Sequence, residues 1–339
     1  MFDSSTDHSV TNMSMDKQQY LISRLADGCF HSGESLAEEM GISRAAVWKR
    51  IKSLADLELD IYSVNGKGHR LSQPIELLDA NTIKANMTAI GLSRIEELKV
   101  IPVLNSTNQH LYDLLQEGSI HGLVVMAEYQ KQGKGRRGND WLSPYASGLC
   151  LSLGWHFHST PASYTALSLA TGVAVCRSLL RMGVSEAGLK WPNDIMSKGK
   201  KLGGILLESR SETAGCSDVV IGIGININLA DKTLSTITQP VTDVNRIAGQ
   251  SISRNVLSGI LVDELLIMLE DYQNSGFSSC IEQWREFDTL SGQQADLILP
   301  NDIFSGEILG IDENGLLLMS VKGETKRFSS GELSLRVRS

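Results

Sequence analysis

The length, composition and charge of the chain exclude several classes of protein. At 339 residues with 42% hydrophobic residues, the chain is long enough for two or more domains with packed cores. Its net charge of −8 excludes binding to nucleic acid through overall positive charge, so any DNA contact needs a local basic patch.

Cysteine usage and hydropathy indicate a cytoplasmic protein. The five cysteines are scattered and form no C-x-x-C pair, which argues against structural zinc and favours a reducing compartment. No apolar run approaches the roughly 18 residues that a membrane helix needs. Residues 1–15 lack the features of a signal peptide and are expected to form a disordered tail.

Residues 16–76 have the pattern of a winged helix-turn-helix. Three helices are expected, over residues 18–25, 34–40 and 44–57. A short turn with Gly41 separates the last two, as in helix-turn-helix motifs. Two short strands then flank Asn65-Gly66, which is a strong hairpin signal and predicts a wing. The alternative is a small helical interaction module with a solvated face.

The third of these helices is unusually basic. It carries four cations and no acid before Asp56, although the chain as a whole is acidic. A recognition helix places such side chains on phosphates and base edges in the major groove. The predicted DNA contacts, including one near the tip of the wing, are Ser43, Arg44, Lys49, Arg50, Lys52 and Lys67.

A polar segment is predicted to open the first helix of the central region. Ser106 and Gln109 have the spacing of a capping box, and the following leucines give the helix an apolar face. Simple capping is one interpretation of Ser106-Thr107-Asn108. A binding role is compatible with it, because a helix N-terminus offers free N–H groups to a polar ligand.

Residues 133–138, Gly-Lys-Gly-Arg-Arg-Gly, are named the cationic loop. Its glycines allow close backbone approach to a bound anion, and its three cations favour a phosphate or a carboxylate. The loop also fits G-x-G-x-x-G, but a dinucleotide fold requires a helix directly afterwards. Pro144 and an alternating strand follow instead. The third interpretation is a solvated basic turn.

The rest of the chain alternates between helices and buried strands. A core helix is expected over residues 162–182, strands over 189–196, 202–209 and 219–229, and amphipathic helices over 256–272 and 278–287. Glycines inside the strand 219–229 indicate close approach of a ligand or a neighbouring backbone. From residue 291 onward, five short strands predict a small SH3-like β-barrel.

Four motifs follow one another along the chain. They are Ser-Thr-Asn-Gln at 106–109, the segment AEYQKQGKGRRGNDW around the cationic loop, LKWPND at 189–194 with KLGGILLE at 201–208, and IGIGININ at 221–228. Together and in this order they resemble the motifs of biotin–protein ligases, most closely those of the bifunctional members that are also biotin operon repressors. With the N-terminal region, the resemblance covers nearly everything from about Lys17 onward.

The resemblance implies an α/β (α+β) protein with three folded parts. These would be a winged helix-turn-helix at 16–76, a mixed-sheet, class II synthetase-like ligase domain at 81–290, and an SH3-like β-barrel at 291–339.

The resemblance also implies two activities. The ligase would form biotinyl-5′-AMP from biotin and ATP with Mg²⁺, and transfer biotin to a lysine of a biotin carboxyl carrier protein. With biotinyl-5′-AMP as corepressor, a homodimer would bind operator DNA and repress biotin biosynthesis genes. The alternatives are a non-catalytic biotin-sensing winged-helix repressor and a lipoate–protein ligase of the same fold.

Site residues follow from the resemblance, position by position. Those implied to bind biotin are Ser106, Thr107, Asn108, Gln130, Lys134, Gly135, Arg136 and Lys201. Those implied to bind ATP or the adenylate are Gly133, Arg136, Arg137, Gly138, Trp141, Asn193, Gly204 and Asn226. Lys201 and Arg136 would be catalytic, and Asp194 is a weaker candidate for Mg²⁺.

Two of these residues have plain alternatives, and one departs from the family pattern. Trp141 would stack on adenine or simply pack in the core, and Lys201 would contact the activated carboxyl group or be one of several solvated lysines. Lys134 stands where the family usually has arginine. Because lysine keeps the charge but loses the planar fork, we expect the chemistry to survive with altered affinity for biotin or its adenylate.

Overall fold

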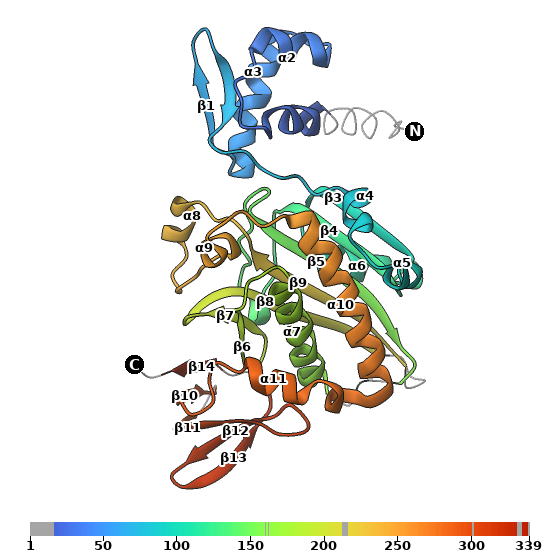
Figure 1. The fold of residues 1–339 in the computed structure, drawn as a ribbon, viewed down its shortest axis with the longest axis vertical. Coiled ribbons are helices and arrows are strands. Elements are labelled where there is room, and N and C mark those ends of the chain that lie inside the picture. The colour runs from blue at the N-terminus through green and yellow to red at the C-terminus, as the bar shows by residue number, and fades with distance from the viewer. Residues whose placement is uncertain are drawn as a thin grey trace, which may run out of the picture. The chain divides into compact units, whose positions relative to one another are not determined.

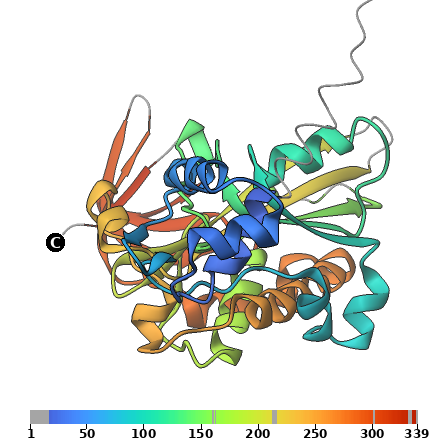
Figure 2. The same cartoon turned by 90° about the horizontal axis from the view of Figure 1, so that it is seen from above.

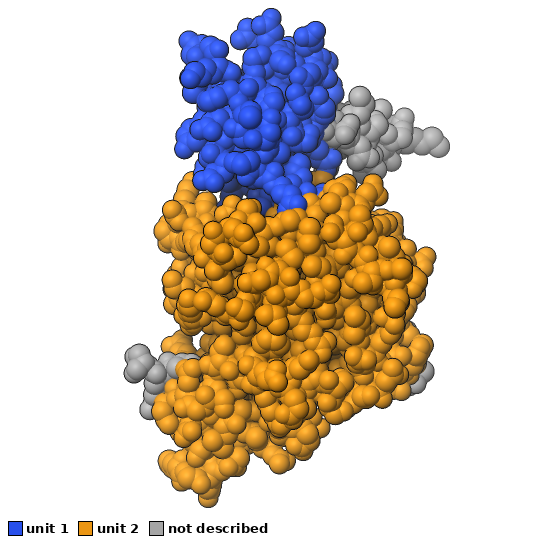
Figure 3. All heavy atoms as spheres, in the orientation of Figure 1, with its two compact units in different colours: residues 1–78, 144–146 blue, residues 79–143, 147–339 orange. Residues whose placement is uncertain are grey.

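The computed structural model describes residues 17–159, 161, 163–211, 216–299, 302–330 and 334–337 (Figure 1). The tail predicted over residues 1–15 lies outside these residues. The chain forms two compact units (Figure 3). Unit 1 comprises residues 1–78 with 144–146, and unit 2 comprises residues 79–143 with 147–339.

Unit 1 has the predicted winged helix-turn-helix fold. Its elements are a helix over residues 17–25, α2 (Gly33–Met40), α3 (Arg44–Ser53), the 3₁₀ turn η1 (Leu54–Leu57), β1 (Ile61–Val64) and β2 (Gly68–Leu71). The Ser32 and Ser43 side chains cap α2 and α3 by accepting backbone N–H bonds. Leu21, Leu36 and Val47 are fully buried and join the helices in one core.

One helix boundary in unit 1 was predicted wrongly. The third helix was expected to run to Leu57, but α3 ends at Ser53 and continues only as the 3₁₀ turn η1. A tightened last turn is a common way to satisfy the final carbonyl groups of a helix. Glu58 then ends the turn in the left-handed conformation, with φ of 61°.

Unit 2 is built on a mixed sheet of seven strands, in the order β3-β4-β5-β9-β8-β7-β6. These strands are β3 (Glu97–Leu104), β4 (Leu123–Gln130), β5 (Gly148–Phe157), β6 (Gly188–Lys190), β7 (Asp194–Ser197), β8 (Lys200–Ser211) and β9 (Ser217–Asn226). Only β3 and β4 pair in parallel, and α6 (Thr107–Leu114) connects them. A parallel pair needs such a crossover, whereas the antiparallel pairs do not.

The prediction of one continuous strand over residues 189–196 is wrong. The segment splits into β6 and β7, which pair with each other as an antiparallel hairpin. Pro192 lies between them and has no N–H to donate to a strand ladder, so a turn forms there. β7 then pairs with β8, which gives the predicted hairpin across Lys198 and Gly199.

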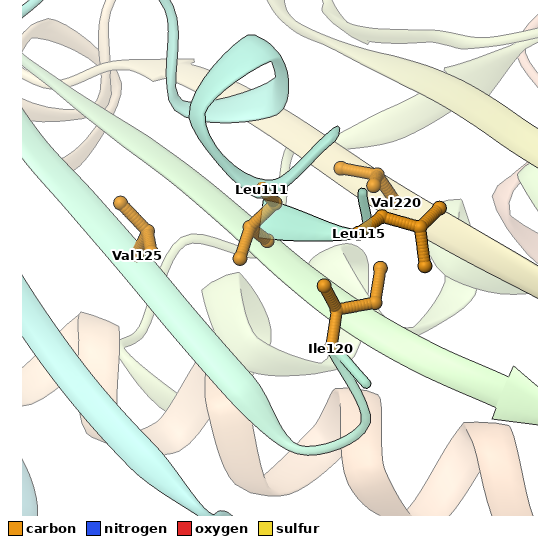
Figure 4. Close-up of a cluster of buried hydrophobic side chains, with 5 residues drawn as sticks. All are labelled: Leu111, Leu115, Ile120, Val125 and Val220. Carbon is orange, nitrogen blue, oxygen red and sulfur yellow. The ribbon is translucent and has the colours of Figure 1, made fainter. Parts of the chain in front are cut away.

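Helices cover both faces of this sheet. α6 packs on β4, β5 and β9, while α7 (Tyr164–Arg181) and α10 (Arg254–Ser275) lie on the other face (Figure 2). Beneath α6, the buried side chains of Leu111, Leu115, Ile120, Val125 and Val220 form one cluster (Figure 4). This cluster fixes α6 on the sheet and thereby positions its N-terminus, residues 106–108, over β9.

Smaller elements complete unit 2. They are α4 (Ala80–Ala85), α5 (Ala89–Arg94), α8 (Asp231–Thr236), α9 (Val244–Ala248), the 3₁₀ turn η3 (Gly276–Ser279) and α11 (Ile281–Phe287). The C-terminal region forms an antiparallel sheet in the order β13-β12-β11-β10-β14. Its strands are β10 (Gln294–Ile298), β11 (Ile303–Ile311), β12 (Leu317–Val321), β13 (Glu324–Phe328) and β14 (Ser334–Val337). Among the described residues, no helix has the length and apolar character needed to cross a membrane.

A buried ion pair joins the two strands that flank the cationic loop to α10. Arg254 donates to Glu128 Oε2 at 2.7 Å, and the two side chains are only 4% and 3% exposed. Arg254 Nε also donates to the Gly148 carbonyl at 3.0 Å, at the start of β5. The pair therefore holds the end of β4 and the beginning of β5 against the start of α10.

Removing one partner of this pair should destabilise unit 2 strongly. Glu128→Ala leaves the Arg254 charge buried, and we expect the free energy of unfolding to fall by about 3–5 kcal/mol. Urea unfolding followed by tryptophan fluorescence measures it, because the buried Trp155, Trp191 and Trp284 all lie in unit 2. Glu282→Ala breaks an exposed pair with Arg285 and serves as control, with an expected loss below about 1 kcal/mol. Equal losses in the two variants would contradict this account.

Candidate ligand pocket

A pocket in unit 2 lies where the N-terminus of α6, the end of β4, the cationic loop, β8 and β9 meet. The predicted residues that line it are Ser106, Thr107, Asn108, Gln130, Lys134, Gly135, Arg136, Trp141, Asn193, Lys201 and Gly204. A larger cavity of about 690 Å³ shares five of these residues and adds the predicted Arg137, Asp194 and Asn226. The predicted Gly133 and Gly138 line neither cavity.

Glycines on β9 form the floor of the pocket. A β-carbon at Gly222 would lie 2.1 Å from Asn108 Oδ1, and one at Gly224 would lie 2.5 Å from the Trp141 ring. Any side chain at either position would therefore displace a pocket wall. The glycines of β9 thus allow the close approach that the sequence predicted.

The N-terminus of α6 brings polar groups into the pocket. Ser106 Oγ accepts a hydrogen bond from Gln109 N at 3.4 Å, as capping predicts. The Gln109 side chain does not complete the capping box, because it bonds to Asp113 and Lys134 instead. Thr107 N donates to Gln130 Oε1 at 2.8 Å, which ties the helix to the end of β4.

Asn108 is held by two residues that sequence reasoning missed. Its Nδ2 donates to Glu208 Oε2 at 2.8 Å and to the Leu206 carbonyl at 3.2 Å. Ser152 Oγ lies 2.6 Å from Asn108 Oδ1 and 2.7 Å from Thr107 Oγ1. Glu208 ends the KLGGILLE motif, and Ser152 is a polar residue within an apolar strand, but neither signal reveals the partners of these side chains.

The cationic loop forms a tight hairpin between the antiparallel strands β4 and β5. Trp141 N donates to the Gly133 carbonyl at 2.8 Å, and Gly135 N donates to the Asn139 carbonyl at 2.7 Å. Arg137 and Gly138 turn the chain in the left-handed conformation, with φ of 60° and 74°. No α-helix opens here in the described chain, so the structure excludes the dinucleotide-binding interpretation, as predicted.

The three cations of the loop differ in their surroundings. Arg136 is half-buried and donates to Asn193 Oδ1 at 3.1 Å and to the Ser330 carbonyl. Burial lowers the pKa of the Arg136 guanidinium, although arginine stays protonated in proteins. Lys134 is exposed and donates to Gln109 Oε1 at 2.6 Å, and Arg137 is also exposed. A half-buried cation such as Arg136 favours an anionic ligand.

Lys201 and Asp194 form an ion pair where the two cavities meet. Their Nζ and Oδ1 atoms lie 2.6 Å apart, and the side chains are 20% and 22% exposed. Lys198 and Lys200 are exposed, so Lys201 does not resemble a solvated surface lysine. In the part of the chain that the structure describes, no group of three or more His, Cys, Asp or Glu side chains is arranged to hold a metal ion.

Two residues of the larger cavity show mainly structural contacts. Asn226 Nδ2 donates to the Thr242 carbonyl at 3.1 Å, and its side chain is buried. Asn193 Nδ2 donates to the Ile205 carbonyl at 2.9 Å, while its Oδ1 accepts from Arg136. Asn193 therefore connects β8 to the cationic loop.

The predicted DNA-binding residues lie on α3 and at the wing of unit 1. Arg44, Lys49, Lys52 and Lys67 are exposed, Arg50 is half-buried, and Ser43 caps α3. Sequence reasoning did not single out Trp48 on α3, a residue that is 53% exposed and whose ring centroid lies 3.7 Å from Lys52 Nζ.

Comparison with known families identifies all three regions. Residues 100–226 match the Biotin/lipoate A/B protein ligase family, residues 17–70 match an HTH domain, and residues 290–336 match the Biotin protein ligase C terminal domain.

Whole-chain relatives and solved structures agree. The chain is 38% identical to the bifunctional ligase/repressor BirA of Salmonella typhimurium, over 93% of this chain and 96% of the relative, and 37% identical to that of Escherichia coli over the same shares. The solved structure of a biotin protein ligase from Aquifex aeolicus, in complex with biotin and ATP, has the same fold, with a TM-score of 0.62. The two sequences are 23% identical, and the match covers 72% of this chain and all of that one. The chain therefore belongs to the biotin–protein ligase family, among its bifunctional ligase/repressors.

Proposed function

We propose that this protein is an ATP-dependent biotin–protein ligase that also represses transcription by binding DNA. The observation that carries the proposal is the combination of two sites in one chain. Unit 2 has a glycine-floored pocket with the half-buried Arg136 and Lys201, and unit 1 has a winged helix-turn-helix with an exposed basic helix. Family membership supports both halves.

The α6 end of the pocket suits the cyclic urea of biotin. Ser106 Oγ accepts from a backbone N–H, so its own hydrogen is available to a ligand carbonyl group. Thr107 Oγ1 lies beside it and accepts from a ligand N–H. A neighbouring donor and acceptor match the C=O and N–H of a urea, which lipoate lacks.

The cationic end of the pocket suits activation of the carboxyl group. A biotin carboxylate oxygen bonds to the α-phosphorus of ATP, the bond to the bridging oxygen breaks, and pyrophosphate leaves. Arg136 and Lys201 neutralise the anions that meet in this step, which is the main requirement of such catalysis. The acceptor lysine then attacks the carbonyl carbon of biotinyl-5′-AMP, AMP leaves, and the amine proton passes to solvent.

Asp194 is our candidate for holding Mg²⁺ with the nucleotide. Mg²⁺ is often held by one or two carboxylates together with substrate phosphates, so a site without a protein cage fits it. Asp194 lines the larger cavity beside Lys201 and offers one such carboxylate. A bound Mg²⁺ would neutralise part of the phosphate charge.

Intact mass spectrometry of a biotin carboxyl carrier domain tests the ligase. We expect one biotin on one lysine, only with Mg·ATP, because transfer requires the adenylate. Lys201→Ala should slow transfer by about a hundredfold, since it removes one charge-stabilising group. Lys200→Ala, at the exposed neighbour, is the control and should leave the rate unchanged.

Two results would redirect the assignment. Biotin binding without any transfer would favour the non-catalytic repressor. Transfer of lipoate in preference to biotin would favour a lipoate ligase.

The repressor half would respond to the ligase product. We propose that biotinyl-5′-AMP bound in the pocket favours a homodimer, whose two winged helices bind a palindromic operator. The cationic loop is glycine-rich and exposes Lys134, Arg137 and Gly138, so it is suited to change conformation when it covers a ligand.

Neutralising the basic helix should weaken DNA binding. With biotinyl-5′-AMP present, Lys49→Ala should weaken binding to the promoter of the organism's biotin genes and reduce the slope of log affinity against log salt by about 1, because it removes a phosphate contact. Fluorescence anisotropy at several salt concentrations measures this. Lys99→Ala in unit 2 is the control, and an equal effect of the two changes would contradict the assigned surface.

A further inference from the structure

A chain of hydrogen bonds runs behind the pocket from Glu208 to Thr107. Glu208 on β8 accepts from Asn108 Nδ2 at 2.8 Å. Asn108 Oδ1 lies 2.6 Å from Ser152 Oγ on β5, which in turn lies 2.7 Å from Thr107 Oγ1. Thr107, Asn108 and Ser152 are buried, with exposed fractions of 4%, 4% and 0%.

The chemistry of Glu208 determines which atom donates in each hydrogen bond of this series. A carboxylate and a backbone carbonyl only accept hydrogen bonds, so both Nδ2 hydrogens of Asn108 point to Glu208 and the Leu206 carbonyl. Asn108 Oδ1 therefore faces Ser152 and can only accept.

The same reasoning determines whether Thr107 donates or accepts. Ser152 has one hydroxyl hydrogen, and Asn108 Oδ1 takes it. Thr107 Oγ1 lies 2.7 Å from Ser152 Oγ and 3.2 Å from Gln130 Oε1, and its one hydrogen goes to one of these two oxygens. Thr107 Oγ1 is left with lone pairs only, so it meets a ligand in the pocket as an acceptor.

We propose that Glu208 is a positioning residue for ligand recognition. Acting through Asn108 and Ser152, it holds Thr107 Oγ1 as an acceptor and selects ring ligands that present an N–H at this point. The resemblance implied that Asn108 contacts biotin directly, whereas on this account Asn108 connects Glu208 to Ser152 by hydrogen bonds. Gly222 makes the link possible, because a β-carbon there would lie 2.1 Å from Asn108 Oδ1. The inference rests on the proposed function in that it takes biotin as the ligand.

Four variants in the full chain test this role: Glu208→Ala, Glu208→Gln, Ser152→Ala, and the double variant Glu208→Ala with Ser152→Ala. We expect each alanine change to raise the KM for biotin roughly tenfold, about the effect of one lost hydrogen bond. The kcat and the KM for ATP should stay within about twofold, because the nucleotide end of the pocket is untouched.

Two comparisons separate positioning from a general structural effect. Because both alanine changes break the same chain, the double variant should be no worse than the single variants. Glu208→Gln keeps an oxygen that accepts from Asn108 and should restore a KM for biotin near that of the unmodified protein. Glu186→Ala removes an exposed carboxylate and serves as control. Ser152→Ala keeps the test valid if Glu208→Ala fails to fold, since it removes only a hydroxyl group.

Several results would overturn the inference. These are an unchanged KM for biotin in Glu208→Ala or Ser152→Ala, additive effects in the double variant, or a Glu208→Gln variant as defective as Glu208→Ala. If the unmodified protein transfers biotin and any of these results is found, the role of Glu208 is rejected and the proposed ligase function stands. If the unmodified protein transfers no biotin, the proposed ligase fails, and calorimetric biotin affinities of the same variants decide the role of Glu208.

Discussion

The close approach of the α6 N-terminus to β9 is the constraint on which the pocket depends. It requires glycine at position 222, where the Asn108 amide lies against the strand. Gly224 likewise leaves room for the ring of Trp141, which follows the cationic loop. The apolar cluster beneath α6 supplies the packing that holds the helix there. With the helix fixed, Ser106 and Thr107 line the pocket. In the proposed function they serve there as a neighbouring donor and acceptor, so ligand recognition at this end would follow from backbone packing.

The opposite end of the pocket is organised by charge. Arg136 is half-buried between Asn193 and Ser330, and Lys201 is paired with Asp194. A bound anion satisfies such cations better than solvent does, which suits the meeting of a carboxylate with phosphates. The buried pair of Glu128 and Arg254 steadies the strands on both sides of the cationic loop and so holds the two ends of the loop in place.

Much of this arrangement was predictable from sequence, because motifs preserve local spacing. The winged helix-turn-helix, the mixed sheet, the family and the ligase function are confirmed, whereas the assigned site residues, the domain boundaries, Mg²⁺ and the homodimer stay predictions. The prediction of one strand over residues 189–196 was wrong because the chain turns at Pro192 and the residues on its two sides pair with each other as β6 and β7. Ser152 and Glu208 were missed because their contacts depend on strand register, which places Ser152 opposite Gly222 and Glu208 opposite Val220. Sequence spacing does not encode that register.

Calorimetric titration of biotin into glycine variants tests whether this close approach creates the binding site. Gly118→Ala is the matched control, because a β-carbon at Gly118 meets no atom within 4 Å. We expect the unmodified protein and Gly118→Ala to bind biotin equally. Gly222→Ala should bind at least about tenfold more weakly, because overpacking displaces Asn108, while circular dichroism shows an intact fold. Equal biotin affinity in Gly222→Ala would contradict the account.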